Sequence, residues 1–145
     1  MDIRQPVSAI MTREVTYVKT NTSVEEISRL FDTKKFHHLP VVDDEGIAIG
    51  MISEGDYFKL MDSMSIFETT SADHENKKMF RSLIAAEIMV PKPFSIHEDG
   101  SIESALRVFT ENHFRALPVV NDGKIVGILT PIDIMKAMLI AGSES

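Results

Sequence analysis

Two short motifs in the chain combine a hydroxyl group with a carboxylate at the same spacing. Asp56 follows Ser53 by three residues, and Asp133 follows Thr130 by three residues. A carboxylate held one turn into a helix can accept hydrogen bonds from two neighbouring hydroxyl groups, and the N–H groups that begin a helix suit a phosphate. The same spacing is close to a capping box, which needs no ligand. The motifs therefore predict either a ligand site or two capped helices.

A glycine precedes each motif, at Gly50 and Gly127. Because glycine has no Cβ, these two positions would let a ligand approach the backbone closely. The matching glycines are part of a longer internal repeat. The pair Ile-Met at 10–11 recurs at 88–89, an offset of 78 (88 minus 10), and Leu-Pro-Val-Val at 39–42 recurs at 117–120. A repeat of this period predicts two small subdomains, which we expect to pack together and share a core.

The elements that must position the motifs are the same in both copies. Short apolar segments at 15–18 and 94–96 precede helical patterns, the first of which Thr22 would cap. A hairpin follows, with strands at 39–42 and 47–52 in the first copy and at 117–120 and 124–129 in the second. Each hairpin leads into a helix, and Thr130-Pro131 is a strong helix start. The order strand, helix, strand, strand, helix predicts an α/β fold.

The boundaries follow from the repeat. We expect repeat 1 over residues 1–66, a linker or helix over 67–82 and repeat 2 over 83–145. Residues 62–78 are polar and rich in Ser and Thr, which favours a solvated linker with a helix starting near Asp73, while a contact surface for a partner is the alternative.

Composition narrows the class of protein. The 145 residues are 43% hydrophobic, contain no Cys and carry a formal net charge of -7. The absence of Cys excludes thiol catalysis and thiolate metal sites. The excess of carboxylates argues against nucleic-acid binding, and no apolar run approaches the roughly 18 residues of a membrane span. The first residues contain no apolar signal core, so we expect a cytoplasmic location.

The repeated Leu-Pro-Val-Val, turn, glycine and Ser/Thr-x-x-Asp pattern resembles the CBS domain, named for cystathionine β-synthase. The resemblance runs from about Val7 to Met138 and looks like a stand-alone tandem pair. It implies an α/β module of two pseudo-twofold-related β-α-β-β-α repeats packed through their sheets, as in a Bateman module. It further implies a regulatory, non-catalytic role in which AMP, ADP, ATP or S-adenosylmethionine binds in the cleft between the repeats, with no cofactor required.

The resemblance also implies which residues contact the ligand. Each site would take ribose contacts from one copy and an adenine wall and phosphate anchor from the other. One site would combine Ser53 and Asp56 with Phe94, Phe114 and Arg115, and the other would combine Thr130 and Asp133 with Thr16, Phe36, and His37 or His38. Arg115 is the better phosphate anchor because its charge is permanent, whereas a histidine is only partly charged near neutral pH. Core packing is the alternative role for Phe36 and Phe114.

The histidines and glycines of the chain favour neither a metal site nor a catalytic loop. His37 and His38 are neighbours, so on a strand they point to opposite faces and cannot easily chelate one ion; we expect no metal site. The seven glycines form neither a phosphate-binding loop nor a dinucleotide motif, which argues against an enzyme of those classes. The resemblance implies a homodimer formed through the closing helices and leaves room for an unidentified regulated protein. A ligand-free structural or protein-interaction module is the alternative function.

Overall fold

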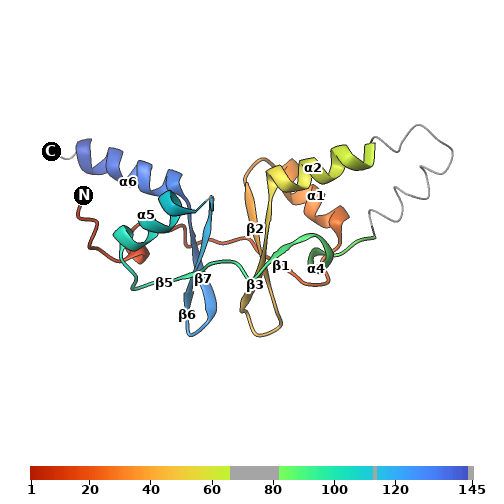
Figure 1. The fold of residues 1–145 in the computed structure, drawn as a ribbon, viewed down its shortest axis with the longest axis horizontal. Coiled ribbons are helices and arrows are strands. Elements are labelled where there is room, and N and C mark those ends of the chain that lie inside the picture. The colour runs from red at the N-terminus through yellow and green to blue at the C-terminus, as the bar shows by residue number, and fades with distance from the viewer. Residues whose placement is uncertain (66–81, 113, 144–145) are drawn as a thin grey trace. The chain divides into compact units, whose positions relative to one another are not determined.

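A computed structural model describes residues 1–65, 82–112 and 114–143 of the chain. The chain divides into two compact units (Figure 1), each named here by the aspartate of its motif. The Asp56 unit comprises Thr16–Asp44 and Ile49–Lys92, and the Asp133 unit comprises Met1–Val15, Glu45–Ala48 and Pro93–Ser145. Residues 1–15, which begin repeat 1, thus belong to the Asp133 unit, and residues 83–92, which begin repeat 2, belong to the Asp56 unit. The predicted linker lies outside the described residues except for Ser82, as does the predicted helix start near Asp73.

The Asp56 unit contains a four-stranded sheet in the order β1-β2-β3-β4. The strands are β1 (Val18–Lys19), β2 (His38–Val42), β3 (Ala48–Ser53) and β4 (Val90–Pro91). β1 runs parallel to β2, and β4 runs antiparallel to β3 with Val90 opposite Met51. The helices are α1 (Val24–Asp32), α2 (Glu54–Ser65) and the short α4 (Ala85–Ile88). Strand β4 and helix α4 come from residues 83–92, at the start of repeat 2.

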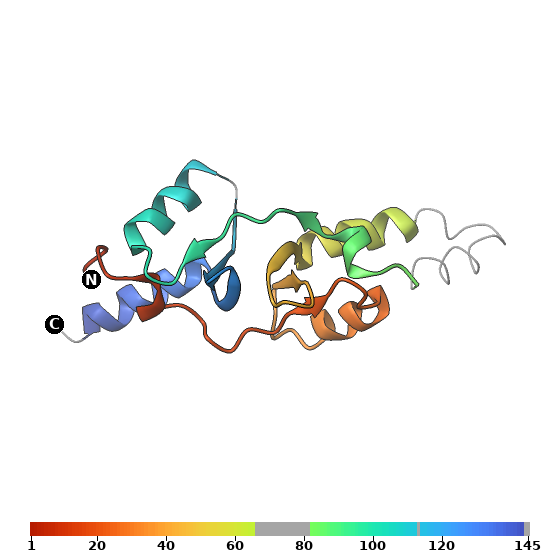
Figure 2. The ribbon, with the colours of Figure 1, turned by 90° about the horizontal axis from the view of Figure 1, so that it is seen from below.

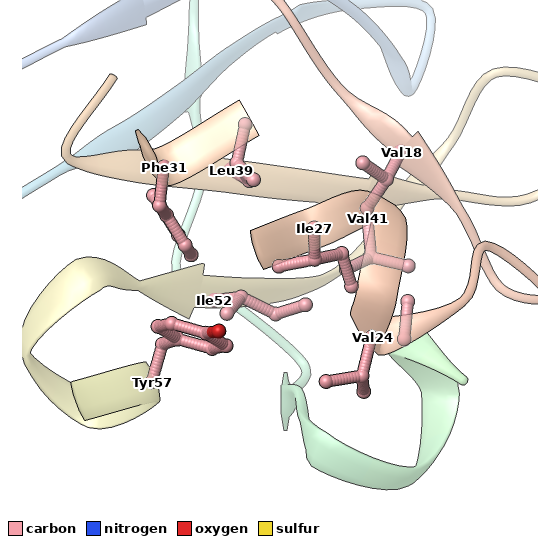
Figure 3. Close-up of a cluster of buried hydrophobic side chains, with 9 residues drawn as sticks. Val18, Val24, Ile27, Phe31, Leu39, Val41, Ile52 and Tyr57 are labelled. Atoms are coloured by element: carbon pink, nitrogen blue, oxygen red, sulfur yellow. The ribbon is translucent and has the colours of Figure 1, made fainter. Parts of the chain in front are cut away.

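Apolar residues from every layer of the Asp56 unit form its core (Figure 3). The ring centroids of Phe31 on α1 and Tyr57 on α2 lie 5.4 Å apart, a tilted aromatic contact. Full burial of such side chains supplies the main favourable free energy of folding. The other buried members of the core are Val18, Val24, Ile27, Leu39, Val41, Ile52 and Ala85.

The Asp133 unit contains a three-stranded sheet in the order β5-β6-β7. Its strands are β5 (Ile96–His97), β6 (Leu117–Asn121) and β7 (Lys124–Leu129), and its helices are the 3-10 turn η1 (Val7–Ala9), α5 (Ile102–Glu111) and α6 (Pro131–Ser143). Figures 1 and 2 show α5 and α6 beside this sheet. The buried core consists of Val7, Met11, Ile102, Ala105, Leu117, Val119, Leu129 and Ile134.

The predicted hairpins and closing helices are confirmed. Asp122 and Gly123 turn the chain between β6 and β7 with φ values of 50° and 78°, the conformation that a tight hairpin turn requires. The predicted cap at Thr22 is wrong by one residue. Ser23 caps α1 by accepting a hydrogen bond from the Glu26 N–H at 3.2 Å, because the Thr22 hydroxyl instead accepts the Lys19 N–H at 2.9 Å. The first strands, predicted at 15–18 and 94–96, are shorter and begin later in the chain, at Val18–Lys19 and Ile96–His97.

Candidate functional site

Both motifs stand where a strand passes into a helix. Ser53 ends β3 directly before α2, and its Oγ accepts a hydrogen bond from the Asp56 N–H at 3.0 Å. Thr130 stands between β7 and α6, and its Oγ1 accepts a hydrogen bond from the Asp133 N–H at 3.3 Å. The hydroxyl group therefore caps the helix in each unit, as the capping interpretation predicts. The two carboxylates differ.

The carboxylate of Asp133 is hydrogen-bonded within its own unit. Its Oδ2 accepts the Thr130 N–H at 2.9 Å and the Thr130 hydroxyl at 3.2 Å. Its Oδ1 accepts the hydroxyl of Thr12, 121 residues away in the sequence, at 3.0 Å. Thr12 is fixed in place because its backbone exchanges two 2.9 Å hydrogen bonds with Ile128 of β7. The result is a closed capping box with an additional donor.

The carboxylate of Asp56 has no such partners. It lies exposed in the first turn of α2, and within residues 1–65, 82–112 and 114–143 no hydrogen bond or ion pair engages it. An ionised carboxylate accepts about four hydrogen bonds. Asp56 therefore keeps its full capacity for the two neighbouring hydroxyl groups of a sugar.

The glycines of the motifs serve packing, which corrects the prediction that a ligand approaches them. A Cβ on Gly50 would collide with the side chain of Met89, whose Cγ would lie 2.8 Å away. A Cβ on Gly127 would meet the Sδ of Met11 at 2.5 Å and the backbone oxygen of Thr12 at 3.0 Å. The repeated Ile-Met pairs thus fill the space beside the repeated glycines, and that space is closed to a ligand.

Two aromatic side chains form an exposed pair in the Asp133 unit. The rings of Phe94 and Phe114 lie 5.9 Å apart at 32°, and the residues are 49% and 41% exposed. The predicted alternative, that Phe114 packs in the core, therefore does not hold. An exposed aromatic pair offers a flat apolar surface on which a base could stack. Arg115, the next residue, is also exposed, and none of the described residues bonds to its guanidinium group.

The residues predicted for the second adenine wall lie in the Asp56 unit. Phe36 is partly buried and packs against the core, which supports its alternative role in packing. Thr16 is partly buried just before β1, and His38 begins β2. His37 is exposed, and its Nδ1 lies 3.7 Å from Oε1 of Glu54. Each predicted site takes residues from both units, so the structure describes its halves separately.

Glu54 changes the electrostatics around the first turn of α2. Its side chain is only 20% exposed, and its Oε2 is buried with no hydrogen-bond partner among the described residues. Glu54 and Asp56 together place two carboxylates at the positive end of the helix dipole. A phosphate finds little attraction there, and a protonated His37 would already face a carboxylate. Arg115, by contrast, carries a permanent charge that no carboxylate among residues 1–65, 82–112 and 114–143 compensates.

Sequence reasoning missed Thr12 and Glu54 as parts of the site. Thr12 follows the Ile-Met pair, and the register of the two bridges makes Val90 its counterpart: Thr12 pairs with Ile128, and Val90 pairs with Met51. Thr12 and Val90 occupy the same position of the two repeats when these are aligned, so a comparison of residue types there could have found that one has a hydroxyl group and the other has none.

Within the described residues, no group of three or more His, Asp or Glu could hold a metal ion, and no helix is long and apolar enough to cross a bilayer.

The fold and motifs define a tandem α/β-repeat protein in which the closing helix of each repeat begins at a hydroxyl-capped turn that carries a carboxylate. The chain belongs to the CBS domain family, whose model matches residues 7–63 and 85–140. The resemblance seen in the sequence is therefore confirmed.

Individual relatives agree with this assignment. The chain is 33% identical over 138 residues to the chloroplastic CBS domain-containing protein CBSX2 of Arabidopsis thaliana, covering 84% of this chain and 58% of the relative's length. The structure of CBSX2 in complex with AMP superposes with a TM-score of 0.77 and 30% identity, covering 95% of this chain and 98% of that chain. The CBS domain pair of protein MJ0100, in complex with 5'-methylthioadenosine and S-adenosylmethionine, gives 0.70 and 25%, covering 95% and 97%.

Proposed function

We propose that this protein is a regulatory module that binds an adenosyl ligand such as AMP, ADP, ATP or S-adenosylmethionine. The observation that carries the proposal is the pair of carboxylate motifs, each in the first turn of a helix, in a chain whose relatives hold adenosyl compounds. A carboxylate fixed at this position can accept both hydroxyl groups of a ribose. The Asp56 carboxylate, which has no partner among the described residues, is well suited to that contact.

The other contacts of the ligand follow from the exposed groups. We propose one site from Ser53, Asp56, Phe94, Phe114 and Arg115, and a second from Thr130, Asp133, Thr16, Phe36, and His37 or His38. The exposed Phe94 and Phe114 rings would stack on adenine, and Arg115 would pair with a phosphate. The pairing of groups from the two units rests on family resemblance.

A regulatory and non-catalytic role fits the residues available. The motifs supply hydrogen-bond acceptors and caps, and the chain contains no Cys that could act as a nucleophile. Binding would act by favouring one arrangement of the protein, because a ligand shifts a conformational equilibrium only by its difference in affinity for the two states. A regulated partner protein would respond to that arrangement.

A homodimer is part of the proposal. Helix α6 exposes a stripe of large apolar side chains, of which Leu139 is 74% exposed and Met135 is 61% exposed. Such a stripe is unfavourable in water unless another surface covers it. A second copy of the chain would do so through the same helix, as a twofold interface requires.

Thermal unfolding with AMP, ADP, ATP and S-adenosylmethionine tests the ligand proposal directly. A ligand present at about 100 times its Kd stabilises the folded state by about 2.7 kcal/mol. For a chain of this size such a gain raises Tm by roughly 5–10 °C. Phe94→Ala should reduce the shift, whereas Phe58→Ala, which removes an exposed aromatic outside the proposed sites, should not. Unchanged melting curves with all four compounds at millimolar concentration would contradict the proposal.

A further inference from the structure

The two carboxylate motifs are equivalent in sequence but differ in how many acceptor positions they offer. Asp133 uses three of its roughly four acceptor positions: two on Oδ2 for Thr130 and one on Oδ1 for Thr12. One position remains, while the neighbouring hydroxyl groups of a ribose need two. A ribose can therefore bind Asp133 in full only after one of these donors leaves, and the Thr12 hydroxyl is the donor that lies outside the Thr130 capping box.

The counterpart of Thr12 cannot act in this way on Asp56. Val90 occupies the matching position beside β3, since Val90 pairs with Met51 as Thr12 pairs with Ile128. Valine has nearly the shape of threonine but has no hydroxyl group, and the residue is 56% exposed. This single difference in residue type leaves Asp56 with no internal donor from β4.

A second contact affects the same predicted site as Thr12. The imidazole of His37, one of the residues grouped with Asp133, faces the Glu54 carboxylate at 3.7 Å. Arg115, grouped with Asp56, has no partner among the described residues. Both the sugar-binding and the phosphate-binding groups of the Asp133 site are thus engaged within their own units, while those of the Asp56 site have no partner in the part of the chain that the structure describes.

We propose that the Thr12 hydroxyl is an internal competitor for the ribose subsite of Asp133, so that adenosyl ligand fills the Asp56 site first and the Asp133 site only at higher concentration. The inference rests on the proposed function and adds an order of occupancy to it. The competition is set by one hydroxyl group that belongs to residues 1–15, at the start of repeat 1. The internal donor must be displaced before a ribose binds at Asp133, and this cost appears as weaker affinity.

Reciprocal exchange of the two residues tests this order, with AMP as the ligand and titration calorimetry as the measurement. Asp56→Ala isolates the Asp133 site, and adding T12V in that background should tighten AMP binding about three- to tenfold, the value of one hydrogen bond. Asp133→Asn isolates the Asp56 site, and adding V90T there should weaken AMP binding by a similar factor. Both exchanges keep the side-chain shape nearly unchanged, so the fold is retained, and circular dichroism of each variant verifies this.

The outcomes separate the inference from the proposed function. Wild-type protein should bind a first AMP that is lost in Asp56→Ala and kept in Asp133→Asn. Equal affinity at the two sites, or an Asp133 site that T12V leaves unchanged or weakens, overturns the inference while the proposed function stands. Both the inference and the proposed function would be overturned if neither the wild type nor T12V bound any of AMP, ADP, ATP and S-adenosylmethionine.

Discussion

The side chain of Met89 lies so close to the Cα of Gly50 that no Cβ fits between them, and Met11 lies beside Gly127 in the same way. The two contacts join residues that are distant in sequence within each unit. They explain why Ile-Met and the glycine recur together. In each unit a methionine from the first residues of the other repeat closes the space next to the strand that leads to the motif.

Adding a methyl group at these glycines should therefore destabilise the fold. Gly127→Ala should lower the free energy of unfolding by about 1–3 kcal/mol, the usual cost of overpacking. Gly50→Ala should carry a similar cost, because its added Cβ would meet the Cγ of Met89 at 2.8 Å and the Cβ of Met89, which is fixed to the backbone, at 3.0 Å. Urea denaturation measures both changes.

Gly55 provides the matched control. It lies in α2 with no atom within 4 Å of an added Cβ. Gly55→Ala should leave stability unchanged or raise it by up to about 1 kcal/mol, because alanine favours a helix over glycine. Equal stability of Gly127→Ala and the wild type would show that the Met11 contact is not tight in solution.

The two aspartates should differ in their contribution to stability. Asp133→Ala removes the acceptor for Thr130 and Thr12 and should cost about 1–2 kcal/mol. Asp56→Ala removes a carboxylate without a partner among the described residues and should change stability by less than about 0.5 kcal/mol. Denaturation without ligand is the measurement, and equal losses at both positions would contradict the asymmetry seen here.

This difference marks the limit of what the sequence predicts. The repeat, the hairpins, the helix starts at Glu54 and Pro131 and the capping hydroxyl groups all follow from local patterns, because caps and turns depend on residues close in sequence. Whether each carboxylate is hydrogen-bonded depends on a residue from a distant segment, which a β-bridge brings close to it. Thr12 reaches Asp133 across 121 residues, and no local pattern contains that contact.

The roles of the glycines and of His37 also depend on tertiary contacts. A glycine beside a candidate motif fits a ligand or a packed side chain equally well, and only the placement of Met89 and Met11 decides between them. His37 directly precedes β2 and Glu54 directly follows β3, so both lie at the open end of the hairpin, and the contact of their side chains depends on how β2 and β3 align. Sequence predicted the groups available for chemistry, and tertiary contacts determine which of them are free.

Arg115 should matter for the phosphate of the ligand and not for its nucleoside. Arg115→Ala should weaken AMP binding about tenfold, as expected for loss of a charge-assisted hydrogen bond, and should leave adenosine binding unchanged. Arg107→Ala is the control, because Arg107 is exposed on α5 and pairs with Glu103 at 3.5 Å. Titration calorimetry with both ligands gives the comparison. Equal loss of AMP and adenosine affinity would assign Arg115 another role.

The apolar stripe on α6 should control assembly. Ile132, Met135 and Leu139 recur at helical spacing on the exposed side of α6, so one charge among them should oppose burial of the whole stripe. The wild type should sediment as a dimer, and Leu139→Glu should sediment as a monomer with an unchanged circular dichroism spectrum. Leu139→Met, which keeps the side chain apolar at similar volume, should remain a dimer. A monomeric wild type at high protein concentration would refute the homodimer, and a dimeric Leu139→Glu would place its interface on another surface.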